Sequence, residues 1–182
     1  HAAIGGGVEN AVDRVLNWAV YFCDFGRYQP PLPRGPVAYA ADVNICYKRA
    51  ALERTREVWT GRFHETTVHW AMQRAGDTIV LDERMIVDQR RDGLSIGRML
   101  GERWAWGRLF AHTRAREIGV LRRVVLAVLC PLLPVVLFAR HAGMRWSKRR
   151  SLVPFVRAAP AVLLLCIAWS AGEFAGYATG RP

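Results

Sequence analysis

The architecture of this chain can be inferred outward from one run of residues, Asp42-Val43-Asn44-Ile45-Cys46-Tyr47-Lys48-Arg49-Ala50-Ala51-Leu52. Its polar start leads into apolar residues at helical spacing, which predicts a helix over residues 48–58. A second helix is expected over residues 66–75, because Gly76 follows it and glycine commonly ends a helix. The segment Phe63-His64-Glu65 therefore lies between two predicted helices.

Strands are expected on both sides of these helices. Residues 37–41 form a short apolar run before the loop, and residues 78–81 and 85–87 form two more after the second helix. Upstream, residues 8–25 carry apolar side chains at helical spacing, with Asn10 in the N-cap position. The alternation of strands and helices predicts an α/β segment.

Two segments near the start of the chain are expected to be irregular. The run Gly5-Gly6-Gly7 is a turn signal, and four prolines within residues 30–36 impose an extended loop, because each fixes φ. Further along, residues 94–110 alternate apolar and basic side chains. That pattern is typical either of an amphipathic helix at a bilayer surface or of a surface helix packed on the domain.

Composition divides the chain into a charged part, residues 1–117, and a part with two long apolar stretches, residues 118–182. The formal net charge of +11 suits either nucleic acid or an anionic membrane surface. Basic residues crowd around the apolar stretches, as they do beside membrane segments. The sequence contains no zinc-finger spacing and no aromatic-basic signature of an RNA-binding sheet. We therefore expect membrane lipids, and not nucleic acid, as partners.

The two apolar stretches predict membrane segments of different kinds. Residues 158–177 are long enough to span a bilayer, whereas residues 124–139 fall slightly short of the roughly 20 residues required and contain Pro131 and Pro134. Basic clusters flank the shorter stretch on both sides, which conflicts with the positive-inside rule for a simple hairpin. Two arrangements stay open: a re-entrant segment with the prolines at its apex, or an ordinary spanning hairpin.

Common metal and nucleophile motifs are not met. His64 and His69 are five residues apart, whereas the zinc-protease motif needs histidines four apart on one helical face. The four cysteines contain no CxxC pair, so we interpret them as reduced structural thiols. No Ser/His/Asp constellation can be built from the sequence.

Taken in order and spacing, several segments resemble the acceptor-side half of a bacterial family 2 glycosyltransferase. They are Gly6-Gly7-Val8-Glu9-Asn10, Trp18-Ala19-Val20-Tyr21-Phe22, Asn44-Ile45-Cys46-Tyr47-Lys48-Arg49, Phe63-His64-Glu65, Gly76 and Arg103-Trp104-Ala105-Trp106-Gly107-Arg108. The resemblance covers residues 5–117. It implies part of an α/β nucleotide-diphospho-sugar transferase (GT-A) fold, followed by helical membrane segments.

The resemblance also implies site residues. The acidic pair of the family, counted back from Gly76, falls on His64 and Glu65, so Glu65 can supply the carboxylate that the family uses as general base. Asn44 and His64 are expected to contact the acceptor. Each position also has a structural interpretation, because Glu65 can stabilise a helix N-terminus and Asn44 can cap the following helix.

Arg103 and Trp104 match the Arg-Trp of the processive members' Gln-x-x-Arg-Trp motif, which implies contact with the diphosphate. Leu100 stands in place of the Gln, so a single-transfer enzyme is expected. Arg103 and Trp104 can alternatively serve as anchors at the membrane interface.

The mechanism implied by the resemblance is an inverting displacement, in which Glu65 deprotonates a hydroxyl of a glycan or lipid-linked acceptor. That oxygen would attack a nucleotide-sugar donor, usually with Mg or Mn held by Asp-x-Asp, a motif absent from this chain. The donor-binding half and the metal ligands are expected before His1, so the chain alone is expected to be inactive. The implied location is the bacterial inner (plasma) membrane, with the catalytic part in the cytoplasm. The alternative is a non-catalytic membrane-anchoring or scaffold module.

Overall fold

The computed structural model describes residues 1–61 and 63–181, which fall into two compact units. The first unit holds His1–Ala11 and Arg27–Gln89, and the second holds Val12–Gly26 and Arg90–Pro182. This division differs from the boundary at residue 117 that composition predicts.

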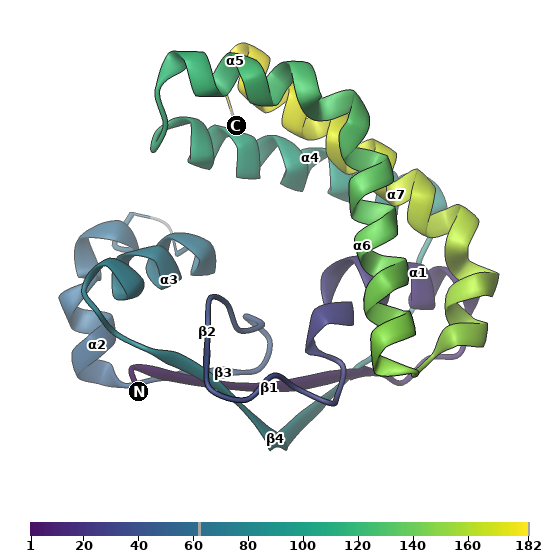
Figure 1. The fold of residues 1–182 in the computed structure, drawn as a ribbon, viewed down its shortest axis with the longest axis horizontal. Helices are drawn as coiled ribbons and strands as arrows, with labels where there is room; N and C mark the ends of the chain where they lie inside the picture. Colours follow the sequence, from purple (N-terminus) through teal and green to yellow (C-terminus); the bar gives the residue numbers. More distant parts are fainter. Residues whose placement is uncertain (62, 182) are drawn as a thin grey trace. The chain divides into compact units, whose positions relative to one another are not determined.

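A four-stranded mixed sheet forms the frame of the first unit, which agrees with the predicted α/β class (Figure 1). Its strands lie in the order β2 (Pro36–Val37), β4 (Ile79–Gln89), β1 (Ala3–Asn10) and β3 (Ile45–Tyr47). Strand β1 is parallel to β4 and antiparallel to β3, and β2 is antiparallel to β4. Because β1 and β4 are parallel, they need a long crossover connection, and the whole segment between them in the sequence forms it. The two strands predicted over residues 78–87 are one continuous strand, β4.

The glycine run lies inside β1, which corrects the prediction of a turn. A Cβ atom on Gly6 would lie 2.0 Å from the carbonyl oxygen of Met85 on β4. The pairing of β1 with β4 also shifts register between Gly6 and Gly7. Glycine in a strand often marks such a close backbone approach. Because the strand continues to Asn10, that residue caps no helix, and Arg14 occupies the N-cap position of the next helix.

Two helices follow β3, as the sequence predicts. Helix α2 (Arg49–Arg54) continues into a 3₁₀ turn at Arg56–Val58, and α3 spans Glu65–Arg74 before Gly76, whose φ is +78°. Residues four apart lie on the same face of a helix, and Val68 and Met72 of α3 are fully buried in this way. They pack with Ala2 and Ala51 in one apolar cluster.

The second unit is helical, and α7 (Leu152–Thr179) is its centre (Figure 1). The other helices all pack on α7; they are α1 (Val15–Asp24), α4 (Ile96–Ala115), α5 (Val120–Leu129) and α6 (Leu133–Lys148). Helix α4 confirms the predicted helix over residues 94–110. The predicted helix over residues 8–25 begins later than expected, at Val15, because β1 takes its first residues.

Small residues bring α4 and α7 into backbone contact. A Cβ on Gly107 would lie 2.2 Å from the Trp169 carbonyl oxygen, and one on Gly172 would lie 2.1 Å from the Trp104 carbonyl oxygen. Gly172 and Gly176 form a Gly-x-x-x-Gly pattern within an apolar helix, which is a known signal for close helix packing in membranes. The sequence alone carries this signal for close packing of α7.

Two helical segments are long and apolar enough to cross a membrane by length and composition. They are Val120–Lys148, which includes a 3₁₀ turn at Cys130–Leu132, and Leu152–Thr179. Only 6% of the most apolar window of the first segment is buried, which is unlike the core helix of a soluble protein. The 3₁₀ turn at Cys130–Leu132 interrupts the helix beside Pro131 and Pro134, and α5 and α6 run in clearly different directions on either side of it (Figure 1).

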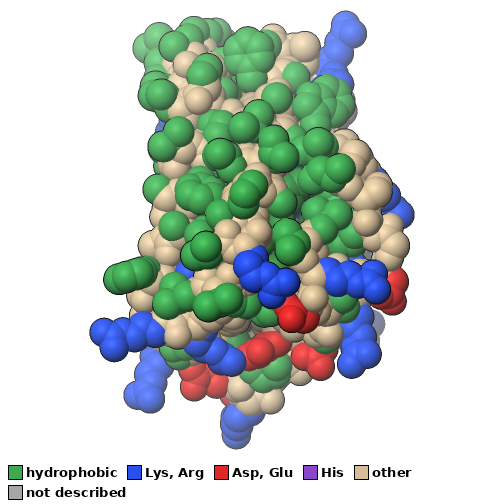
Figure 2. Space-filling model, turned by 90° about the vertical axis from the view of Figure 1, so that its right-hand side faces the viewer, with side chains coloured by type: hydrophobic (Ala, Val, Ile, Leu, Met, Phe, Trp, Pro, Cys, Tyr) green, Lys and Arg blue, Asp and Glu red, His purple; other side chains and the backbone are tan. Residues whose placement is uncertain are grey.

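Hydrophobic side chains gather on the surface of these helices (Figure 2). The exposed members include Val135, Val136, Val153, Val156 and Ile167. Arg145 belongs to the basic cluster of the sequence but is 1% exposed, and its guanidinium donates a hydrogen bond to the Gly26 carbonyl oxygen. The surface charge next to the apolar helices therefore comes from its neighbours in the sequence, such as Arg149 and Arg150.

Candidate functional site

Glu65 is the first residue of α3 and is half-buried. His64 precedes it in the N-cap position, but the His64 side chain makes no capping hydrogen bond. The buried Nδ1 of His64 has no hydrogen-bond partner among residues 1–61 and 63–181. Glu65 therefore lies where the helix dipole favours a carboxylate, next in sequence to a buried imidazole nitrogen without a partner among the described residues.

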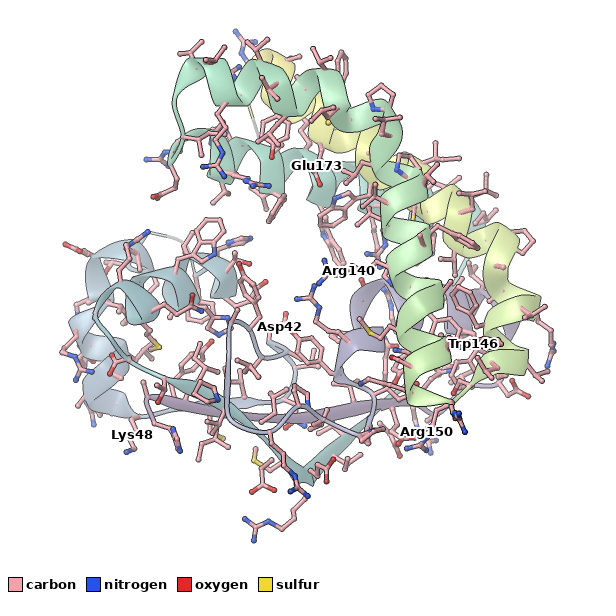
Figure 3. All side chains as sticks on the ribbon, in the orientation of Figure 1. Asp42, Lys48, Arg140, Trp146, Arg150 and Glu173 are labelled. Carbon is pink, nitrogen blue, oxygen red and sulfur yellow. The ribbon has the colours of Figure 1, made fainter. Side chains whose placement is uncertain are left out.

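A second carboxylate and two tyrosines accompany Glu65 in the first unit. Asp42 lies on the loop before β3 (Figure 3), Tyr47 lies on β3 itself and Tyr28 is in the segment after α1. Burial raises the pKa of Tyr47, and the charges of Glu65 and Asp42 raise it further. The same two carboxylates also raise the pKa of Tyr28, whose main perturbation is burial. Both phenols therefore stay protonated beside two acidic side chains.

More aromatic and cationic groups line this region of the first unit. The guanidinium of Arg27 lies 6.0 Å from the Tyr28 ring centroid and 5.9 Å from that of Tyr39. The Phe63 ring packs edge-on against Tyr47 with centroids 6.3 Å apart. Aromatic rings with a few polar groups are the usual composition of a small-molecule site.

His69 is a buried, neutral base that contacts Tyr47. Its Nε2 lies 2.9 Å from the Tyr47 hydroxyl, and its ring has no exposed surface. Burial lowers the pKa of His69 to about 4, because the charged imidazolium is poorly solvated there. A neutral His69 can accept a hydrogen bond from Tyr47 and so fix the orientation of that phenol.

Asn44 has a structural role in this fold. Its side-chain nitrogen donates to the Gly7 carbonyl oxygen at 2.9 Å and to the Met85 carbonyl oxygen at 3.0 Å, so both amide protons are used. It therefore ties the loop to β1 and β4, and it does not cap α2, whose N-cap position is Lys48. This correction removes Asn44 as an amide donor to the acceptor.

Arg103 and Trp104 lie on α4 in the second unit. Arg103 is 5% exposed, and its guanidinium pairs with the buried carboxylate of Asp24 and stacks on Trp106 at 5.2 Å. Breaking a buried pair costs about 3–5 kcal/mol, so Arg103 is not available to a diphosphate. Trp104 is 40% exposed and stacks with Arg108. We correct the expectation for Arg103 to a structural one.

The described side chains do not fit a hard divalent cation. Mg²⁺ and Mn²⁺ prefer oxygen ligands, and no three carboxylates gather within ligand distance in residues 1–61 and 63–181. The one cluster of potential ligands in this part of the chain is Cys23, His141 and Cys166, which offers sulfur and nitrogen. We therefore derive no catalytic step through a cation held by these residues.

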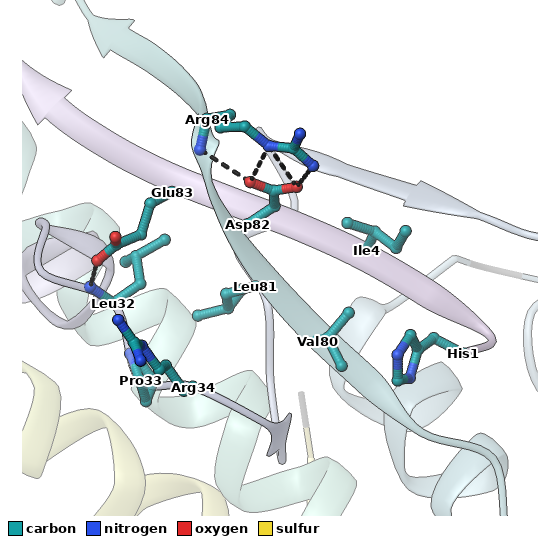
Figure 4. A pocket seen from close by; sticks show the side chains of 10 residues that line it. All are labelled: His1, Ile4, Leu32, Pro33, Arg34, Val80, Leu81, Asp82, Glu83 and Arg84. Atoms are coloured by element: carbon teal, nitrogen blue, oxygen red, sulfur yellow. Dashed lines mark hydrogen bonds and ion pairs between the residues drawn. The ribbon is translucent and has the colours of Figure 1, made fainter.

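A pocket of about 430 Å³ lies elsewhere on the first unit (Figure 4). Three of its charged groups are engaged locally: Asp82 pairs with Arg84 at 2.7 Å, and Glu83 accepts a hydrogen bond from the Leu32 amide at 2.9 Å. Glu65, Asp42 and the tyrosines do not line it. The pocket is thus a feature of the sheet surface and not the chemical site.

Sequence analysis assigned no site role to Tyr28 or Tyr47. Tyr47 follows Asn44 by three residues, and strand alternation could have assigned it to the same face as Ile45. Tyr28 carries no sequence signal of this kind.

Comparisons with protein-family models, with curated proteins and with solved structures found no match to this chain.

Proposed function

We propose that this chain is part of a membrane-associated, inverting glycosyltransferase of the GT-A type. In this proposal its first unit faces the acceptor, which is a hydroxyl of a glycan or of a lipid-linked saccharide. The observation that carries the proposal is that the charges of Asp42 and of Glu65, which begins α3, act on both Tyr28 and Tyr47. A carboxylate for proton transfer beside aromatic rings suits a hydroxylated, ring-shaped ligand.

Glu65 acts as the general base in the proposed reaction. Its carboxylate takes the proton of the acceptor hydroxyl while that oxygen bonds to the anomeric carbon of the donor sugar. The bond between that carbon and the diphosphate oxygen breaks at the same time, and the nucleoside diphosphate leaves with the electron pair. Because attack and departure occur on opposite faces, the anomeric configuration inverts. His64 Nδ1, which is buried beside Glu65, contacts the bound acceptor.

Membrane attachment keeps this site near a membrane-bound acceptor. The exposed apolar surface of Val120–Lys148 and Leu152–Thr179 supports the attachment, since neither segment is mostly buried. Basic residues such as Arg149 and Arg150 at the junction of α6 and α7 suit acidic headgroups. The proposed location is the bacterial inner membrane, with the first unit in the cytoplasm.

The test is the substitution Glu65→Gln in the protein as the cell makes it, assayed in membranes with nucleotide-sugar donors. Loss of the general base should lower transfer by about 10²–10⁴-fold, while expression and membrane retention stay unchanged. The matched control is Glu57→Gln, which removes an exposed carboxylate from the same unit and should leave the rate within twofold.

The same experiment separates the transferase from a scaffold. A non-catalytic anchoring module would be indifferent to Glu65→Gln in every cellular readout. Equal transfer rates for Glu65→Gln and Glu57→Gln would therefore rule out the proposed general base.

A further inference from the structure

Three potential metal ligands meet inside the second unit. Cys23 comes from the last turn of α1, His141 from α6 and Cys166 from α7. Their ligand atoms all lie within 4.8 Å of one another. Cys166 is 2% exposed, and the other two side chains are half-buried. We refer to these residues as the Cys-His-Cys cluster.

The side chains of this cluster already face one another. The atoms concerned are the sulfur atoms of Cys23 and Cys166 and a ring nitrogen of His141. The cluster offers no oxygen ligand. Thiolate and imidazole ligands select soft or borderline cations such as Zn²⁺ and Cu⁺ over Mg²⁺ and Mn²⁺.

We propose that the Cys-His-Cys cluster is a zinc site with two thiolate ligands, one imidazole ligand and an open fourth position. In a tetrahedral site with zinc–sulfur bonds of about 2.3 Å, neighbouring ligand atoms lie roughly 3.8 Å apart. Ligand atoms that begin within 4.8 Å of one another therefore need to close by about 1 Å or less. Side-chain rotation suffices for a movement of that size.

Charge balance selects Zn²⁺ over Cu⁺. Two thiolates and a neutral imidazole give a neutral complex with Zn²⁺ but a net negative one with Cu⁺. A buried site disfavours uncompensated charge. The nearest charged pair, Arg103 with Asp24, is already neutral as a pair. It therefore does not compensate an anionic complex.

The site joins the three helices that carry its ligands. Helix α1 is far from α6 and α7 in the sequence, and the zinc ion would bind it to both. This proposal does not depend on the proposed transferase activity, because no ligand belongs to the group around Glu65.

Because thiols lose their protons when they bind zinc, we expect the affinity to rise with pH.

The test uses the full chain, purified in detergent under reducing conditions and stripped with a chelator. Titration with Co²⁺ should produce thiolate-to-cobalt charge-transfer absorption that saturates at one equivalent and is lost on addition of Zn²⁺. Cys23→Ser, His141→Ala and Cys166→Ser should each weaken binding by about 100-fold or more, since even outer-sphere partners contribute roughly 10–100-fold.

Cys46→Ser and Cys130→Ser are the matched controls, because these thiols lie outside the cluster. They should bind Co²⁺ like the parent chain. A second measurement needs no variant and therefore tests the site even if the variants misfold. In the parent chain, Zn²⁺ should slow the alkylation of Cys23 and Cys166 and leave that of Cys46 unaffected. Absence of charge-transfer absorption in the parent chain, or equal loss in the controls, would overturn the zinc site.

Discussion

The buried imidazole of His69 makes the stability of the first unit depend on pH. Its pKa is about 4 in the folded chain, against an ordinary value of 6.5, because burial penalises the charged form. Between these values the unfolded chain binds more protons, so unfolding becomes easier as pH falls from 6.5 to 4. The predicted loss is up to about 3 kcal/mol. Hydrogen exchange of the α3 amides, corrected for intrinsic rates, should show it as lost protection.

His69→Gln provides the comparison, since Gln keeps a polar partner for the Tyr47 hydroxyl but does not titrate. The difference in protection between parent and variant should shrink as pH falls through this window. His1→Gln replaces an exposed histidine of the same unit and should reproduce the parent profile. A parent profile as flat as that of His69→Gln would contradict a buried, neutral His69.

Residue roles were predictable where they depend on local sequence and not where they depend on distant partners. Glu65 lies at the start of α3 as its spacing to Gly76 indicates. The amide of Asn44, in contrast, is bound by carbonyl groups 37 and 41 residues away. The guanidinium of Arg103 is paired with Asp24, 79 residues away. No sequence motif indicates such pairings, so both residues were predicted to bind ligands.

At the scale of elements, the contact between α4 and α7 depends on glycine. A methyl group on Gly172 would meet the Trp104 carbonyl oxygen at 2.1 Å, and backbone cannot yield as a side chain can. We predict that Gly172→Ala forces the helices apart and costs about 1–3 kcal/mol, as overpacking does. Thermal unfolding of the detergent-solubilised chain, followed by circular dichroism, measures the effect.

Gly101→Ala is the matched control on α4, because nothing lies within 4 Å of a Cβ atom there. Replacing an unconstrained helical glycine by alanine should stabilise the chain by about 0.5–1 kcal/mol. The two substitutions are thus expected to shift the unfolding temperature in opposite directions. Shifts of the same sign would mean that α4 and α7 do not pack through Gly172.

Element types were predicted better than their limits. Helix α3 was found because its periodicity and the glycine that follows it, Gly76, agree. The run Gly5-Gly6-Gly7 was assigned to a turn because glycine signals both turns and close strand contacts. Only the position of Met85 on the neighbouring strand distinguishes the two interpretations, and that information is not local.

At the scale of the molecule, the charged and apolar parts of the sequence are not the two compact units. Residues 12–26 lie between β1 and the other three strands in sequence but belong to the helical unit. Phe22 of α1 packs edge-on against Phe155 of α7, with ring centroids 5.3 Å apart. Composition reports the average polarity of a segment and not which segments pack together. It therefore predicted a boundary at residue 117.

This division predicts the behaviour of a truncated chain. Residues 1–117 expressed alone keep α1 and α4 but lose α7, so the apolar faces that these helices bury against α7 become exposed. Exposed apolar surface of this kind drives aggregation. We therefore expect the truncated chain to aggregate. The full chain should stay with membranes through alkaline carbonate washing until detergent is added.

Coexpression of residues 118–182 should restore the truncated chain to the membrane fraction, because it returns α7 to α1 and α4. A monodisperse, cooperatively unfolding 1–117 in size-exclusion chromatography would instead place the boundary where composition set it.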